Sequence, residues 1–282
     1  MVRRRWGGGA AVVRLVFVDM DDTFVSPDKT ISPDNLRALD RAHERGVEVV
    51  PCTGRSRRGL PRELVAHPCV RHAVCGGGAL VYDLRADRVL RKVAIDRALV
   101  RSLYGDVRDQ RITFDLFTSE GVFAATDRWP LYYEIEMTEP TRQMVLAQRV
   151  RVECTTEELI DRVPTICRVN VLFASREGRR AVLDAVARRP ELVGVSSIPM
   201  NVEVTSAMAT KGTALLWLCE HLGVSPADTV AFGDSGNDVS MLEVAGDGVA
   251  MANACPECLA VADHVAPPCT ESGVARYLAT LL

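Results

Sequence analysis

The strongest constraint on the fold is a pattern that occurs twice, a short apolar run that ends directly at acidic residues. Residues 15–18 (Leu-Val-Phe-Val) run into Asp19, and residues 229–232 (Thr-Val-Ala-Phe) run into Gly233 and Asp234. Continuous apolar runs of this length are typical of strands buried on both faces of a parallel sheet. Carboxylates at such strand ends lie at the carboxyl edge of the sheet, where open α/β sheets bind ligands.

Helical segments alternate with these strands. Ser32 can cap a helix that starts at Pro33 and closes at Gly46, and strands at 47–52 and 73–75 follow. Late in the chain we expect helices at 210–222, 239–245 and 273–281, and strands at 249–251 and 264–265. Strand–helix–strand alternation predicts an α/β fold with a doubly wound parallel sheet.

The middle of the chain has a different pattern. Strand-like pieces at 112–117, 121–125 and 168–173 precede a helical stretch near Val182. We expect residues 84–195 to form an inserted α+β domain. The core then comprises 1–83 and 196–282, with 1–12 as a flexible tail.

Composition excludes several classes of function. A formal net charge of −3 gives no reason to expect nucleic acid or a membrane surface as a partner, and no run approaches the ~18 apolar residues that span a bilayer. The nine cysteines are an odd number in mostly apolar contexts, which favours reduced thiols and a cytoplasmic location. Cys255-Pro-Glu-Cys258 fits a helix start better than a metal or redox site, because no second pair lies at zinc spacing.

Three predicted strand ends and one helix start bring chemically related side chains to one edge. Carboxylates that meet there repel one another unless a cation neutralises them, and oxygen ligands without a histidine cluster favour Mg²⁺. A lysine, a threonine hydroxyl and free amides suit a phosphate group, and a carboxylate can serve as the nucleophile of phosphoryl transfer. The residues concerned are Asp19, Asp21, Asp22, Thr53, Lys211, Asp234 and Asp238.

These residues carry a resemblance to a known family. Asp19-Met-Asp-Asp-Thr-Phe24 resembles the first motif of the haloacid dehalogenase superfamily, DxDGT[LF]. Thr53-Gly-Arg55, Lys211 and the segment 233–238 resemble its second, third and fourth motifs, in order. Met251-Ala-Asn-Ala254 and the C-terminal segment are similar to the Cof-type branch (class IIB), which includes many sugar-phosphate phosphatases.

The resemblance implies catalytic roles for two aspartates. Asp19 would be the nucleophile, forming an aspartyl-phosphate, and a metal ligand. Asp21 would ligate the metal through its backbone carbonyl and act as general acid and then as base.

The remaining site residues would hold the metal and the substrate. The resemblance implies that Thr53 and the Gly54 amide hold the phosphoryl group, and that Lys211 neutralises it and orients Asp19. Asn237 would contact phosphate. Asp234 would ligate Mg²⁺, with Asp238 behind it or in direct contact.

Two positions depart from the family pattern. Asp22 stands where the first motif usually has glycine, and Gly77 stands where Cof-type relatives usually carry asparagine. The second departure removes a possible contact to the leaving group. The expected partner is a small phosphorylated metabolite, most readily a sugar phosphate, which the sequence does not name further.

Other functions remain as alternatives. Only 34 positions separate Asp19 from Thr53, so a lid domain must follow the second motif, as in the phosphatases rather than the phosphomutases of the superfamily. A phosphomutase and a phosphometabolite-binding regulatory module remain open. A glycosyltransferase with Asp19-Met-Asp21 as its DxD motif leaves Lys211 unexplained.

The chain has only three lysines, Lys29, Lys92 and Lys211. The first two fall in a predicted loop and at the edge of the insertion, and we expect no role in the site for either of them. Lys211 is the one lysine that the resemblance places beside Asp19.

Overall fold

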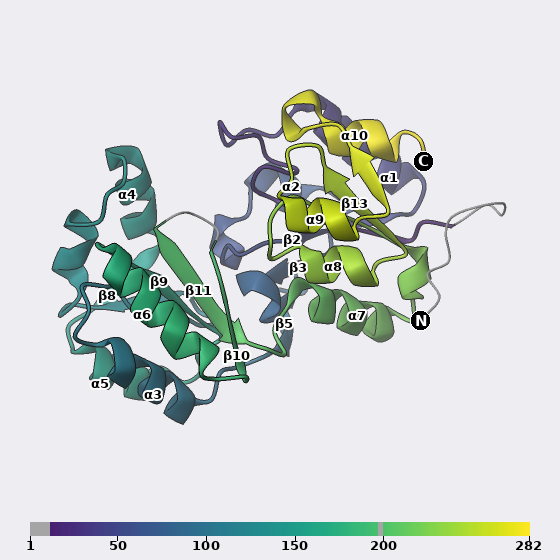
Figure 1. Ribbon diagram of the computed structural model, residues 1–282. Coiled ribbons are helices and arrows are strands. Elements are labelled where there is room, and N and C mark those ends of the chain that lie inside the picture. Colours follow the sequence, from purple (N-terminus) through teal and green to yellow (C-terminus); the bar gives the residue numbers. More distant parts are fainter. Residues whose placement is uncertain (1–11, 197–199) are drawn as a thin grey trace. The chain divides into compact units, whose positions relative to one another are not determined.

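The computed structural model describes residues 12–196 and 200–282, and the chain divides into two units (Figure 1). The first unit combines Met1–Arg91 with Thr210–Leu282, and the second is Lys92–Ala209. Of the expected N-terminal tail, only Val12 lies within the described residues.

The first unit is built on a mostly parallel sheet. In the described part of the chain it has eight strands, and β1 (Leu15–Asp19) lies between β2 (Glu48–Cys52) and β12 (Thr229–Gly233), parallel to both. This arrangement confirms the predicted α/β class. Outward from β12 lie β13 (Asp247–Met251) and β14 (His264–Ala266), and outward from β2 lie β3 (His72–Cys75), β4 (Leu80–Asp83) and β5 (Arg88–Lys92).

Helices cover this sheet, and local signals fix their ends. The Ser32 hydroxyl accepts a hydrogen bond from the Asn35 amide at the start of α1 (Pro33–Glu44), and Gly223 ends α7 (Lys211–Leu222) in the left-handed conformation. Leu215 and Leu218 of α7 pack with Phe17 and Ala231 in the buried core. The remaining α-helices of this unit are α2 (Arg62–Ala66), α8 (Val239–Val244), α9 (Pro256–Val261) and α10 (Gly273–Leu278).

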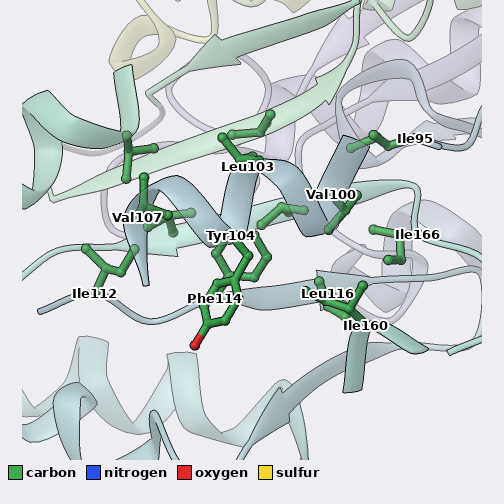
Figure 2. Packing of buried hydrophobic residues seen from close by; sticks show 14 of the residues in the cluster. Ile95, Val100, Leu103, Tyr104, Val107, Ile112, Phe114, Leu116, Ile160 and Ile166 are labelled. Carbon is green, nitrogen blue, oxygen red and sulfur yellow. The ribbon is translucent and has the colours of Figure 1, made fainter. Parts of the chain in front are cut away.

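The second unit has its own sheet and core. Figure 2 shows Leu103, Tyr104 and Val107 of α3 (Arg97–Val107) packed with Leu116 and Ile160. The strand order in the described residues is β10 (Leu192–Val195), β11 (Asn201–Ser206), β9 (Arg168–Leu172), β6 (Asp115–Phe117), β7 (Val122–Ala125) and β8 (Arg149–Val152). Its other α-helices within the described residues are α4 (Glu139–Ala147), α5 (Thr156–Arg162) and α6 (Arg176–Ala187).

The limits of the two units differ from the expected insertion at 84–195. Strand β5 extends the sheet of the first unit beyond β4, so the insertion begins only at Lys92. Strand β11 pairs antiparallel with β9 and β10, so the return to the core comes at Thr210 rather than at residue 196. The pairing of β11 with β9 leaves no local signal, because the two strands lie far apart in the sequence. Strands β4 and β5 are joined by residues 84–87 alone, so the first limit depends on a local hairpin that the sequence analysis did not identify.

Two chemical expectations can be compared with the structure. No helix in the described ranges is long and apolar enough to cross a membrane. All nine cysteines are free thiols.

Candidate active site

The parallel strands bring three predicted site segments to one edge of the sheet. Asp19 is the last residue of β1 and lies opposite Cys52 in the register with β2, so Thr53 follows one residue beyond. On the other side of β1, β12 ends at Gly233 and delivers Asp234. Asp19 and Thr53 are buried, whereas Asp234 is half-buried.

Lys211 is completely buried between two aspartates. Its Nζ donates to Asp19 Oδ1 and, at 2.6 Å, to Asp238 Oδ1. Burial alone would lower the pKa of the lysine, but the two carboxylates outweigh burial and raise its pKa above the usual value. Lys211 is therefore held in its charged form beside Asp19.

A glycine turn positions the helix that carries Lys211. Gly78 follows β3 with φ +109°, and a Cβ built on it would lie 2.2 Å from the Thr210 carbonyl oxygen and 2.8 Å from the Lys211 amide nitrogen. Only glycine allows this approach. Gly78 therefore serves helix packing.

Gly78→Ala should lower the free energy of unfolding by about 2–4 kcal/mol, because it adds a backbone clash to the strain of a positive φ. Gly46→Ala is the matched control, since Gly46 has φ +66° but no atom would lie within 4 Å of a Cβ added there. Its cost should be about 1 kcal/mol. Chemical denaturation measures both, and equal losses would show that the contact with Thr210 contributes nothing.

The loop after β12 is organised by Asp238. Its Oδ2 accepts hydrogen bonds from the amides of Asp234 (3.1 Å) and Ser235 (3.0 Å), while its Oδ1 faces Lys211. The Thr23 hydroxyl donates to Asp234 Oδ1 at 2.6 Å across 211 positions of sequence. Both oxygens of Asp238 thus hold protein groups in place, and the Asp234 side chain is oriented from the first motif.

Three carboxylates meet closely enough to share a cation. Oxygens of Asp19, Asp234 and Asp238 lie within 4.8 Å of one another. With Lys211, the ionised cluster carries two excess negative charges. Burial and the neighbouring Asp238 raise the pKa of Asp19 well above its usual value despite the opposing Lys211.

The same surroundings raise the pKa of Asp234, and a further carboxylate oxygen lies nearby without a hydrogen bond. Burial, opposed by the Thr23 hydrogen bond and reinforced by Asp238, raises the pKa of Asp234 to about 6. Asp22 Oδ1 is buried without a hydrogen-bond partner in the described residues. Hard oxygen donors with excess negative charge fit a divalent cation such as Mg²⁺.

Asp21 lies apart from this cluster and is held by two cations. Arg55 Nε donates to Asp21 Oδ2 at 2.9 Å, Arg55 Nη2 donates to Oδ1, and Lys29 Nζ donates to Oδ1 at 2.9 Å. Burial alone would raise the pKa of Asp21, but Arg55 and Lys29 outweigh it and lower its pKa. We expect no role in the site for Lys29, yet the turn at 26–30 brings its ammonium into an ion pair with Asp21.

The other predicted residues line the same edge. The Thr53 hydroxyl accepts a hydrogen bond from the Arg55 amide at 3.0 Å, and Gly54 lies half-buried between them. Asn237 is half-buried in the loop after β12, where its Oδ1 accepts from the Ser235 hydroxyl at 3.0 Å.

Three residues that contact the site have no role among the predictions from the sequence: Thr23, Arg55 and Lys29. Thr23 and Arg55 lie within the first and second motifs, so their place in the sequence could have indicated that they contact the site. Lys29 could have been found only from the scarcity of lysine.

The two departures from the family pattern have different structural settings. Asp22 adopts φ +61°, a conformation that favours glycine, and the Asn253 side chain donates to its carbonyl at 2.8 Å. Gly77 also has a positive φ, +69°. Asparagine is among the residues that tolerate this region, so the backbone at position 77 does not require glycine.

A parallel α/β sheet with a buried lysine among carboxylates at its carboxyl edge defines a class, the Rossmann-like enzymes that handle phosphoryl groups. The chain belongs to the haloacid dehalogenase-like hydrolase family, whose sequence model matches residues 16–278. This match confirms the expected family and the expectation of a hydrolase.

Individual relatives agree with this assignment. The chain is similar to phosphatase YwpJ of Bacillus subtilis, with 29% identity over 96% of this chain and 100% of the relative. It is 24% identical to 5-amino-6-(5-phospho-D-ribitylamino)uracil phosphatase YwtE of the same organism, over 96% and 98%. The solved structure of BT1666 from Bacteroides thetaiotaomicron, studied among phosphatases of this superfamily, has a TM-score of 0.78 and 27% identity, covering 100% of this chain and 98% of that one.

Proposed function

We propose that this protein is a Mg²⁺-dependent phosphatase that hydrolyses the phosphate monoester of a small metabolite, most readily a sugar phosphate. The observation that carries the proposal is the buried Lys211 between Asp19 and Asp238, with Asp234 completing the carboxylate cluster. The names of the relatives support phosphate ester hydrolysis.

Each protein group has a defined task in the proposed reaction. Asp19 attacks phosphorus to form an aspartyl-phosphate, and Lys211 with the Thr53 hydroxyl and the Gly54 amide balances the phosphoryl charge. Asp19, Asp234 and Asp238 would hold Mg²⁺, which neutralises charge between carboxylates and phosphate when bound. The Asp21 backbone carbonyl would complete its ligands, and Asn237 would contact phosphate.

Asp21 is proposed to give a proton to the leaving oxygen and then to activate water. Arg55 and Lys29 favour its carboxylate form before substrate binds. A dianionic phosphate that draws these two cations away would raise the pKa of Asp21 towards the acid form that the first step needs.

The inserted unit is proposed to act as the cap that selects the substrate. Tyr132 and Asp115 are two polar residues of this unit that could contact substrate. The Tyr132 hydroxyl donates to Asp115, and Arg149 forms an ion pair with Asp115 at 3.0 Å, so the two residues are bonded to each other. Release of phosphate from a panel of phosphorylated sugars, nucleotides and cofactors tests the substrate class. Release from none of them, with Mg²⁺-dependent sugar transfer instead, would contradict the proposal.

Asp21→Asn should reduce the rate of hydrolysis of an alkyl phosphate about 10²–10⁴-fold, because the leaving alcohol needs a proton. With p-nitrophenyl phosphate, the rate of the step that forms the aspartyl-phosphate should fall much less, because nitrophenolate leaves without protonation. Burst kinetics separate this step from dephosphorylation. Asp109→Asn, at an exposed aspartate of the second unit, is the control and should leave both rates unchanged. Equal losses of burst rate on the two substrates would assign Asp21 a different role.

Mg²⁺ should stabilise the protein more at about pH 7.5 than at about pH 5. A raised pKa means that the folded metal-free protein binds the Asp234 proton more tightly than the unfolded chain, so its stability falls as pH rises towards 6. Above pH 6 the carboxylate is free to bind the cation. Thermal unfolding with Mg²⁺ or EDTA at both pH values measures this, and an equal or larger Mg²⁺ effect at pH 5 would contradict it.

A further inference from the structure

Two cysteines that the proposed hydrolysis does not use lie directly behind the metal-binding loop. Cys255 is the N-cap of α9, and Cys258 is the third residue of that helix. Residues three positions apart in a first helical turn lie on the same side. Cys255 is half-buried and Cys258 is fully buried.

Both cysteines are bonded to consecutive carbonyls of the loop. The Cys255 amide donates to the Asp234 carbonyl at 2.8 Å, and Cys258 Sγ donates to the Ser235 carbonyl at 3.0 Å. The amides of these same two loop residues donate to Asp238. The reduced form of Cys258 therefore supports the backbone that presents the Asp234 carboxylate and holds Asp238 beside Lys211.

The surroundings keep Cys258 in its thiol form. Burial raises the pKa of Cys258, and the charge of Asp238 and the adjacent Cys255 raise it further. Its S–H group donates to Ser235, and its position three residues after Cys255 in the first turn of α9 puts the two side chains on the same side of the helix. Cys255 is the member of the pair that an oxidant in solution can reach.

We propose that Cys255 and Cys258 form a reversible disulfide that switches off the active site. The inference rests on the proposed phosphatase function for its effect on activity, whereas the disulfide itself does not depend on that function. The oxidant class is a peroxide.

The chemistry balances in two steps. Cys255 Sγ attacks one oxygen of hydrogen peroxide, the O–O bond breaks, and a sulfenic acid and one water result. Cys258 Sγ then attacks Cys255 Sγ, the S–O bond breaks, and the hydroxide leaves as a second water with the Cys258 proton. Two thiols lose two electrons and one peroxide gains them, and a dithiol reverses the change by exchange.

In the disulfide Cys258 has no S–H group, so it can no longer donate to the Ser235 carbonyl. Its sulfur must also move to about 2.05 Å from Cys255 Sγ, away from the Ser235 carbonyl. That carbonyl then keeps only the Asp238 amide as a donor, at 2.8 Å, and loses its bond to α9, so we expect the loop that carries Asp234 and Asp238 to shift. Because displacements of about 1 Å in a catalytic site can cost 10²-fold, we expect oxidation to reduce turnover at least about tenfold.

The test treats the reduced full-length protein with hydrogen peroxide and follows phosphate release, Mg²⁺-induced thermal stabilisation and peptide mass. Wild type should lose activity and Mg²⁺ stabilisation, show a Cys255–Cys258 disulfide, and recover with dithiothreitol. The Cys255→Ser variant keeps the hydrogen bond from the residue 255 amide to the Asp234 carbonyl and places a preferred N-cap residue there, so it should be active and resist peroxide. Cys154→Ser removes a half-buried thiol of the second unit and should respond as wild type does.

Three results would overturn the inference: no Cys255–Cys258 disulfide in peroxide, a disulfide that changes neither activity nor Mg²⁺ stabilisation, or equal inactivation of Cys255→Ser. If the reduced protein releases phosphate from no substrate, the proposed function fails instead. In that case the inference is still tested by peptide mass, which detects the disulfide, and by the loss of Mg²⁺-induced thermal stabilisation.

Discussion

Asp19→Asn should lower phosphate release at least about 10³-fold, because an amide oxygen cannot form the acyl phosphate. The same change should not destabilise the metal-free protein. The pKa of Asp19 lies well above its usual value mainly because its charge is buried, so a neutral side chain removes an unfavourable charge next to Asp238.

The control for this substitution is Asp109→Asn, at an exposed position in the second unit. Initial rates on p-nitrophenyl phosphate and thermal unfolding in EDTA measure the two effects. A folded Asp19→Asn variant that retains more than a few per cent of wild-type turnover would contradict the nucleophile assignment.

Lys211→Met should lower the free energy of unfolding by about 3–5 kcal/mol and abolish activity. The substitution leaves Asp19 and Asp238 buried without their shared cation, which is the costly way to break a buried ion pair. The stability loss should be smaller at about pH 5 than at pH 7, because without the ammonium the pKa of Asp19 rises further and its protonation relieves the repulsion with Asp238. Denaturant unfolding at both pH values measures it.

The Lys211→Arg variant tests whether the site needs only a positive charge or also the compact shape of the lysine ammonium. The guanidinium keeps the positive charge, but its wider planar fork must fit where Lys211 has no exposed surface. We expect a folded protein with a stability loss of about 1–3 kcal/mol from overpacking and loss of most activity. Lys92→Arg, at an exposed position, should match wild type, and full turnover in Lys211→Arg would show that a compact ammonium is not required.

The core of the fold was predictable because its signals are local. The apolar runs at 15–18 and 229–232 form central strands, and Ser32, Thr210 and Gly223 mark helix ends as their side-chain or backbone chemistry predicts. Parallel pairing of adjacent strands then carries Asp19, Thr53 and Asp234 to one edge without further information.

The rest depends on contacts between distant positions. Thr23 and Asp234 lie 211 positions apart, and Arg55 reaches Asp21 across 34. No periodicity encodes such pairs. The C-terminal limit of the insertion was not predicted for the same reason, since β11 alternates like many strands and its pairing with the distant β9 assigns it to the second unit.

The most direct test of the account is to trap the covalent intermediate. The enzyme is mixed with substrate and Mg²⁺, quenched within a turnover and treated with borohydride, which reduces an acyl phosphate to the alcohol. Peptide mass spectrometry should then find homoserine in place of Asp19 and at no other carboxylate. Active enzyme that releases phosphate but yields unmodified Asp19, or a modification at a different aspartate, would contradict the central claim.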